Sequence, residues 1–391
     1  MITKTPTLKR KPPVAVASEA AESAESTNMV RAKKSKHAEP KIRAPTLEEI
    51  NELKETRNLF HSNLLRLQVK EMLSELQIKQ KHLNFISGWF EQFRVFVAEL
   101  KDNEPSAKLL WLQKSPLQVP LALYQLRINE LELKQIQFQF IKPNSEPLLM
   151  GAAASSTLLA APNGSLMVDI AVNMPSSCFQ KDSYLNLDYD QRRALYLTYV
   201  ANELLKSKQM QLNVDQLLFS YHSNNPLKPV LIIRPTAVDA STNSSAKKVS
   251  FRLFMAGEEQ TFKLARFVPW NSNIRASIFY GHVEENDGES ANYATPHYNA
   301  HVLYDLTMRR NQLALAELFQ AEKRKNLQEA LLLLKVWLQQ RQLNMAYSGM
   351  NGHMLAMFIL YLWQQRKLNA NMSSYQVART VWNQLGRSTV C

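Results

Sequence analysis

One stretch constrains the fold more than any other: Pro147–Pro175, PLLMGAAASSTLLAAPNGSLMVDIAVNMP. Apolar residues run into Gly151, and the small residues that follow predict a short helix, Ala152–Ala160. The Pro-Asn-Gly run at 162–164 ends that helix. Leu166–Val172 then alternates with the period of a strand. The stretch therefore predicts a strand, a glycine turn, a short helix, a second turn and a second strand.

This order resembles the core of the nucleotidyltransferase superfamily, the fold of poly(A) polymerases and oligoadenylate synthetases. There a Gly-Ser turn holds the nucleotide phosphates, and a strand carries two carboxylates, two residues apart, that bind metal ions. Two metals clamp the attacking and leaving oxygens of an in-line displacement, so that chemistry needs paired acids. Here Asp169 and Ala171 share one strand face at the two acid positions, and Ala152 follows Gly151 where the serine belongs. The resemblance implies a degenerate active site at these four residues, with no catalytic residue, metal or cofactor.

A third carboxylate, on a later strand, is needed in the active relatives. The two later segments Val249–Met255 and Thr261–Phe267 predict a hairpin, and neither contains an acid. Glu258 and Glu259 fall in the turn between them, where we expect both to point at solvent. Asp169 is then a structural strand acid, although a lone cation at this position stays an alternative.

The rest of the chain predicts helices around a mixed sheet. Thr46 and Glu49 form a capping box that opens an N-terminal helix, and Leu83–Leu100 predicts a second helix with an aromatic stripe expected in the core. The other predicted elements are, in chain order, a strand at Gln135–Ile141, a helix at Tyr189–Lys206, strands at Leu217–Tyr221 and Val230–Ile233, and helices at Tyr298–Gln320, Asn326–Arg341, Gly352–Arg366 and Ser373–Leu385.

These elements predict an α+β fold: a nucleotidyltransferase-like mixed sheet with flanking helices, followed by an all-helical domain like that of poly(A) polymerases and oligoadenylate synthetases. The predicted segments are a disordered basic tail at 1–45, N-terminal helices at 46–105, the nucleotidyltransferase-like core at 106–290 and the helical domain at 291–391. His297 and His301 have the spacing of a zinc pair, but no third ligand is placed in sequence, so we expect surface histidines.

The net charge of +13 favours an anionic partner, and nucleic acid is the commonest. The tail holds 10 Lys and Arg against 4 Asp and Glu, so nearly half of the excess lies there. Its composition cannot support a packed core. Two clusters in it match a two-part nuclear localisation signal, with a solvated charge run as the alternative: Lys9, Arg10 and Lys11, then Arg31, Lys33, Lys34 and Lys36.

Basic residues outside the tail are scattered in small groups. The candidates for contact with RNA are Arg192, Arg193, Lys247, Lys248, Lys323, Arg324 and Lys325. We expect them to hold the phosphate backbone rather than to read bases, with ordinary helix-face charge as the alternative.

Two cysteines, Cys178 and Cys391, are too few for a disulfide framework and fit a reducing compartment. No signal peptide or membrane-spanning run is visible, so no membrane partner is expected. No small-molecule substrate is expected either, because the resemblance implies a degenerate active site.

A more specific resemblance rests on several motifs in combination. They are VDIAVNMP at 168–175, KDSYLN at 181–186, RRALYL at 192–197, FVPWNSNIR at 267–275 and LLLKVWLQQR at 332–341. Together they resemble the nucleolar RNA-associated protein (Nrap) family, from about Thr46 to the end of the chain. Members resemble two nucleotidyltransferase modules in tandem, so the helical domain here is expected to be incomplete, either in a natural short form or in a partial product.

The resemblance implies a nucleolar, non-catalytic scaffold of ribosome biogenesis. Its partners would be pre-ribosomal RNA and proteins of the small-subunit processome, the assembly that processes this RNA. Two alternatives stay open on the residues alone. One is an active metal-dependent nucleotidyltransferase with a carboxylate that the sequence does not reveal, and the other is a nuclear protein-interaction module without RNA binding.

Overall fold

The computed structural model describes residues 46–48, 50, 63–103, 117, 138–161, 163–206, 214–237, 242–275, 278, 293–320, 324–344 and 349–387. The chain divides into two compact units, Met1–Ser62 and Asn63–Cys391. In the first unit the Ile50 amide donates to the Thr46 carbonyl (2.9 Å), as in a helical turn. The predicted tail, its two basic clusters and Glu49 of the capping box lie outside the described residues.

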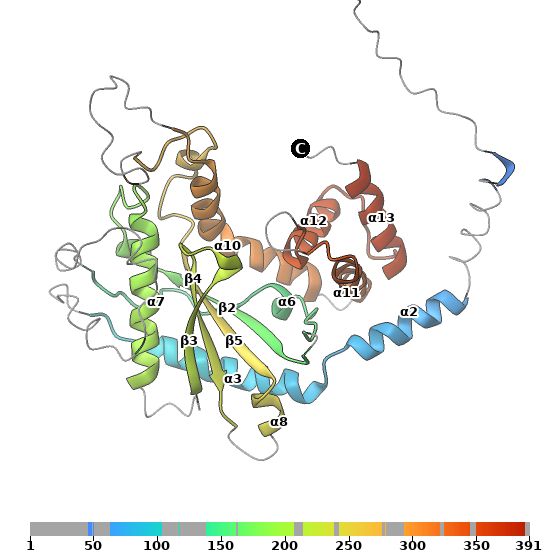
Figure 1. Ribbon diagram of the computed structural model, residues 1–391, viewed down its shortest axis with the longest axis horizontal. Coiled ribbons are helices and arrows are strands. Elements are labelled where there is room, and N and C mark those ends of the chain that lie inside the picture. Colours follow the sequence, from blue (N-terminus) through green and yellow to red (C-terminus); the bar gives the residue numbers. More distant parts are fainter. Residues whose placement is uncertain are drawn as a thin grey trace, which may run out of the picture. The chain divides into compact units, whose positions relative to one another are not determined.

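The second unit is built on a five-stranded mixed sheet with the order β1-β2-β5-β4-β3 (Figure 1). The strands are β1 Leu148–Leu149, β2 Leu166–Met174, β3 Val214–Tyr221, β4 Pro229–Pro235 and β5 Val249–Gly257. β2 and β5 pair in parallel, with Leu166 opposite Val249, and the other neighbours are antiparallel. The two parallel strands therefore start at the same edge of the sheet.

The described residues of this unit form the α-helices α2 Asn63–Leu76, α3 Gln80–Glu99, α6 Gly151–Ala154, α7 Asp188–Lys206, α8 Asn243–Ala246, α10 Pro296–Gln320, α11 Lys325–Gln340, α12 Gly352–Gln364 and α13 Ser374–Arg387. The predicted helices at 83–100 and 189–206 correspond to α3 and α7, and the four predicted C-terminal helices correspond to α10–α13. A mixed sheet with flanking helices, followed by a helical region, confirms the predicted fold class.

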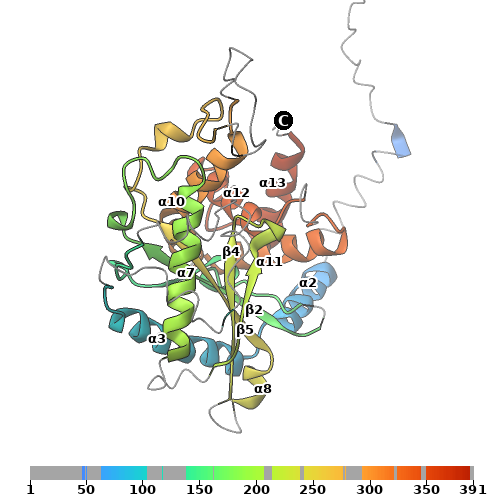
Figure 2. The same cartoon turned by 60° about the vertical axis from the view of Figure 1, so that its left-hand side comes forward.

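One face of the sheet carries the main core. Alternate residues of β2 and β5 are buried there against α3 and α7, and Figure 2 shows α7 running along this side. Trp89 of α3 stacks on Phe251 of β5 with ring centroids 3.8 Å apart, and Phe93 and Phe96 are buried beside it. The aromatic stripe of α3 is therefore core, as its spacing predicts.

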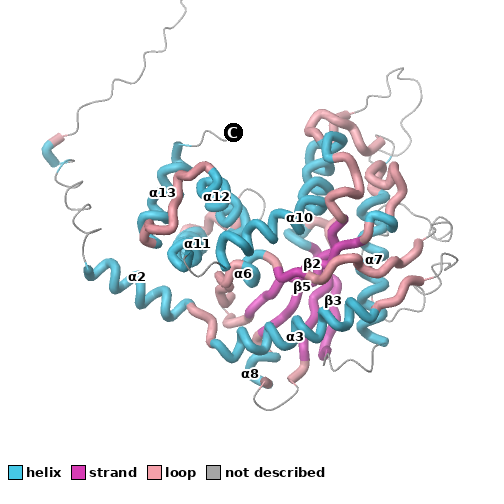
Figure 3. Tube along the Cα trace, turned by 180° about the vertical axis from the view of Figure 1, so that it is seen from behind, coloured by secondary structure: helices cyan, strands magenta, loops and turns pink. Residues whose placement is uncertain are grey.

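Helix α10 contributes to the core of the sheet and to the core of the C-terminal helices. Its residues Tyr298, Val302 and Leu306 are buried in the core of the sheet. Leu315 and Phe319, farther along the same helix, are buried with α11, α12 and α13 in a second core. Figure 3 shows α10 passing from the sheet toward that helical cluster. The reciprocal capping box of α13 also forms, since Ser373 and Gln376 each donate a backbone amide to the other's side chain (2.9 and 3.3 Å).

Three predicted elements are wrong. The helix after Gly151 ends at Ala154, because the Ser155 hydroxyl donates to the Gly151 carbonyl (2.9 Å) and Ser156 has φ of +55°.

Residues 138–141 of the predicted strand at Gln135–Ile141 are coil, with the Phe140 carbonyl accepting from the Asn103 amide. The expected hairpin between Val249–Met255 and Thr261–Phe267 does not form in these segments, which the structure describes in full. β2 pairs with one edge of β5 and β4 pairs with the other, and Leu264–Phe267 is a 3-10 helix.

None of the helices formed by the described residues is both long and apolar enough to cross a membrane.

Candidate functional site

Asp169 of β2 forms an ion pair with Arg252 of β5. Asp169 and Arg252 lie directly opposite each other in the parallel register. The guanidinium donates from Nε and one terminal nitrogen to the two carboxylate oxygens, at 2.8 and 2.9 Å. Both side chains are about a quarter exposed, at 26% and 27%. This bidentate pair occupies both oxygens of the carboxylate that a metal ion would need.

The second acid position lies in an apolar environment. Ala171 is 1% exposed, two residues beyond Asp169 on the same strand face. The buried side chains clustered with it are Met150, Val230, Phe254, Ala256 and Met308. A carboxylate here would lose its hydration among apolar side chains, which opposes its ionised form. Ala171 therefore packs in an apolar cluster that does not favour ion binding.

The glycine turn is occupied from within the protein. Gly151 has φ of +55°, a left-handed conformation that favours glycine. Its amide donates to Oε1 of Gln312 on α10 at 2.9 Å, and Gln312 is 2% exposed. At the other end of α6, the Gln320 side chain donates to the Ala154 carbonyl at 3.1 Å. The amide that opens this turn is thus already satisfied by a side chain of α10.

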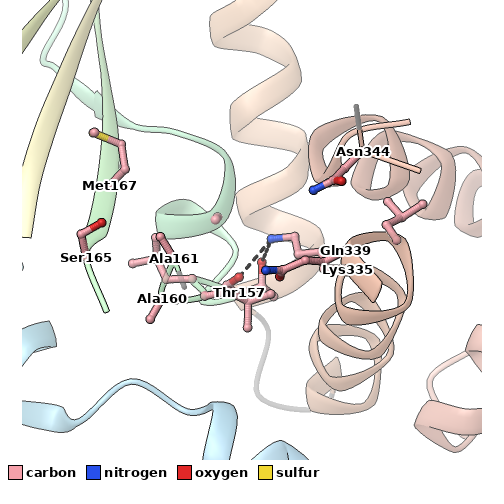
Figure 4. Close-up of a pocket in the computed structure, with 13 residues that line it drawn as sticks. Thr157, Ala160, Ala161, Ser165, Met167, Lys335, Gln339 and Asn344 are labelled. Atoms are coloured by element: carbon pink, nitrogen blue, oxygen red, sulfur yellow. Dashed lines mark hydrogen bonds between the residues drawn. The ribbon is translucent and has the colours of Figure 1, made fainter. Parts of the chain in front are cut away.

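A cavity of about 360 Å³ lies beside the turn (Figure 4). Its lining includes Ala152, Met167 of β2 and Lys335 of α11. The ammonium of Lys335 points at Thr157, where it donates to the carbonyl (3.0 Å) and to the hydroxyl (2.7 Å). Burial lowers the pKa of Lys335 to about 8. The glycine turn therefore adjoins a hollow that is lined by a partly buried amine and small residues.

A buried network of charges contains one of the predicted RNA contacts. Arg193 is 1% exposed; it pairs with Asp305 of α10 and with Asp190, and donates to the Leu227 carbonyl. Lys228 donates to the second oxygen of Asp305 at 2.5 Å. Although burial opposes it, the charges of Lys228, Arg193 and His301 lower the pKa of Asp305. The structure corrects the sequence interpretation of Arg193: its guanidinium joins α7, α10 and the start of β4 and cannot reach a phosphate.

The other predicted basic contacts differ in accessibility. Lys247, Lys248 and Lys325 are exposed. Arg192 is half-buried and paired with Asp188 at 2.8 Å, and Arg324 lies over the Trp363 ring, 4.8 Å from its centroid. Lys323 lies outside the described residues. Lys247 and Lys248 are adjacent between α8 and β5, and the six candidates that the structure describes do not form one cluster.

Three polar residues expected at the surface have partners in the protein. Glu258 accepts from the Ser176 amide (3.0 Å), and Glu259 pairs with Arg310, so neither simply faces solvent. His301 contacts Asp190 through Nε2 (2.8 Å), whereas His297 is exposed. In the part of the chain that the structure describes, no three His, Cys, Asp or Glu side chains are placed to hold a metal ion.

Sequence reasoning missed Arg252, Gln312 and Lys335. Arg252 and Lys335 each stand alone in an apolar run, VSFRLFMAG and ALLLLKVWL, and an isolated charge in such a run is a usable signal. Gln312 gives no such signal, because it is one of many polar residues along α10.

Two family models match the chain. Residues 99–321 match Nrap protein domain 1, and residues 326–390 match the Nrap protein PAP/OAS-like domain. Nucleolar protein 6 from Drosophila virilis is 48% identical over 356 residues, 91% of this chain and 27% of the relative. The protein of the same name from Drosophila pseudoobscura pseudoobscura is 49% identical over 347 residues, 89% of this chain and 26% of the relative. The chain thus spans about a quarter of the length of these relatives.

Among solved structures, the chain is similar to the cyclic AMP-GMP synthase DncV from Vibrio cholerae in complex with nonhydrolyzable GTP. The TM-score is 0.29 and the sequence identity 12%, over 88% of this chain and 74% of that structure.

Proposed function

The chain belongs to the Nrap family, and from that premise we propose that it is a non-catalytic scaffold of ribosome biogenesis. Its relatives at 48–49% identity carry the name nucleolar protein 6, and the nucleolus is its compartment. Pre-ribosomal RNA and proteins of the small-subunit processome are the proposed partners. The chain would meet them through its outer surfaces, while the former catalytic strand serves the core.

The pairing of Asp169 with Arg252 is the observation that carries this proposal. A divalent cation would have to displace a guanidinium that binds both carboxylate oxygens and lies in register on the neighbouring strand. Ala171 offers no second ligand, and its apolar neighbours disfavour charge at that position. Charge stabilisation is usually the largest catalytic term, so a site without paired acids loses most of its rate.

The test is a nucleotide-transfer assay on the purified chain. Labelled ATP or UTP, an RNA primer and either magnesium or manganese are supplied, and primer extension is followed on a gel. We expect no extension by the wild type or by the Asp169→Ala variant. Extension by the wild type that Asp169→Ala abolishes would show an active transferase and would contradict the proposal.

A further inference from the structure

Four lysines gather where α3 begins and where α8 leads into β5. Lys79 and Lys81 flank the first residue of α3, and Lys247 and Lys248 follow α8 directly; all four are exposed. Helices α3 and α8 are in contact, and Figures 1 and 3 show α8 beside the start of α3. We call these four residues the α3–α8 lysine patch.

Two contacts hold the two halves of the patch together. His82 is 6% exposed and meets the Ser245 hydroxyl of α8 through Nδ1 at 2.8 Å. Lys81 donates to the Ser244 hydroxyl at 3.4 Å. Burial lowers the pKa of His82, and the charges of Lys81, Lys248 and Lys79 lower it further, as expected when lysines from both segments lie near one imidazole. The patch is therefore a feature of the fold and not of the sequence alone.

Within the part of the chain that the structure describes, no acidic side chain pairs with the charges of the patch. None of the ion pairs formed by the described residues involves any of the four lysines. The 20-residue helix α3 begins without a side-chain cap and without an acidic residue in its first turn. Cations at a helix N-terminus oppose the helix dipole, which favours anions there. The arrangement is unfavourable for the isolated protein and becomes favourable when an anion is bound.

We propose that the α3–α8 lysine patch binds the phosphate backbone of RNA. This inference rests on the proposed function and adds a specific surface to it. Lysine acts as a compact point charge, which suits phosphates spaced along a strand and carries no base readout. All four charges of the patch come from lysine, a residue type that is depleted in protein–protein interfaces whereas arginine is enriched there, so an acidic protein is the less favoured occupant.

The test compares two charge-matched variants of the full chain. The patch variant carries Lys79→Gln, Lys81→Gln, Lys247→Gln and Lys248→Gln. The control carries Lys101→Gln, Lys181→Gln, Lys263→Gln and Lys367→Gln, four exposed lysines outside the patch. Binding of a labelled 20-nucleotide single-stranded RNA is measured by fluorescence anisotropy across a salt series. Equal thermal melts by circular dichroism verify that both variants fold.

We expect the patch variant to lose affinity on the order of 10-fold at 0.1 M salt, with a smaller loss in the control. Each phosphate contact contributes roughly 0.7 to the slope of log K against log salt, so the patch variant should flatten this slope by up to about 2.8. In a second readout, bound RNA should protect the four patch lysines of the wild type from an amine-reactive label, as measured by mass spectrometry.

Equal losses in the two variants would overturn the patch and leave the scaffold proposal intact. No RNA binding by the wild type would overturn both the patch and the proposed RNA partner. If a glutamate 20-mer needs the four lysines while the RNA does not, the patch serves an acidic protein and the inference is wrong.

Discussion

At the scale of single residues, Lys335 shows what burial does to a charge. Its side chain is partly buried and its ammonium donates two hydrogen bonds to Thr157; burial lowers the pKa of this amine to about 8. The folded state therefore releases this proton at a lower pH than the unfolded chain does. Below pH 8 both states are protonated, and the burial penalty on the charged amine is at its largest.

The prediction concerns the pH dependence of stability. Between about pH 8 and pH 10.5 the unfolded state binds more protons at Lys335, so the free energy of unfolding should rise with pH. The full gain is about 3 kcal/mol. The measurement is urea unfolding of the wild type and of Lys335→Met at several pH values; subtracting the two curves cancels the other titrating groups. A difference that is flat, or that falls with pH, would refute this assignment.

A second residue-scale prediction uses two glycines with open space around them. Gly151 has φ of +55°, whereas Gly88 has no positive φ and lies inside α3; a Cβ at either would meet no atom within 4 Å. Gly151→Ala should therefore destabilise the protein by about 1 kcal/mol, through backbone conformation alone. Gly88→Ala should stabilise it by about 0.5–1 kcal/mol, because alanine is the better helix former. Thermal unfolding of both variants tests the pair, and shifts of the same sign would be inconsistent with it.

At the scale of elements, α10 is held to its neighbours by a buried acid. Asp305 is fully buried and forms ion pairs with Arg193 of α7 and with Lys228, which precedes β4. Removing one member of such a cluster leaves the others buried without compensation, which is strongly destabilising.

Asp305→Asn should lower the free energy of unfolding by about 3–5 kcal/mol, because buried Lys228 loses its carboxylate and Arg193 keeps only Asp190. Asp182, which is 73% exposed, provides the matched control, and Asp182→Asn should change stability by less than about 0.5 kcal/mol. Urea unfolding of both variants is the measurement. A loss below about 1 kcal/mol at Asp305 would mean that the network is not a main support of α10.

At the scale of the whole molecule, periodicity predicted the elements better than it predicted their pairing. The apolar spacing of α3, α7 and α10–α13 is local information, and all six helices form. The hairpin after β5 failed because β2 and β4 pair with β5 from distant parts of the chain, and local alternation does not report that competition.

The candidate site likewise contains residues that a local sequence pattern predicts and partners that no local pattern predicts. Asp169, Ala171 and the Gly151 turn could be identified from one stretch of sequence, because the pattern that marks them is local. The side chains that hydrogen-bond to Asp169 and to Gly151 could not be identified in this way, because they are distant in sequence. Arg252 is 83 residues from Asp169, and Gln312 is 161 residues from Gly151. Arg193 was misjudged for the same reason, since its partner Asp305 is 112 residues away.

The apolar surroundings of Ala171 bear on the evolutionary reversibility of this site. A single change of Ala171 to an acid would place a carboxylate among Met150, Phe254 and Met308 while Arg252 still binds Asp169. Such an intermediate loses stability before it gains any ion, because the second ligand is useful only after the arginine has gone. Under the proposed function, a lineage that has filled the site in this way can reach metal chemistry only by several coordinated substitutions, so selection on single substitutions would keep the fold a scaffold.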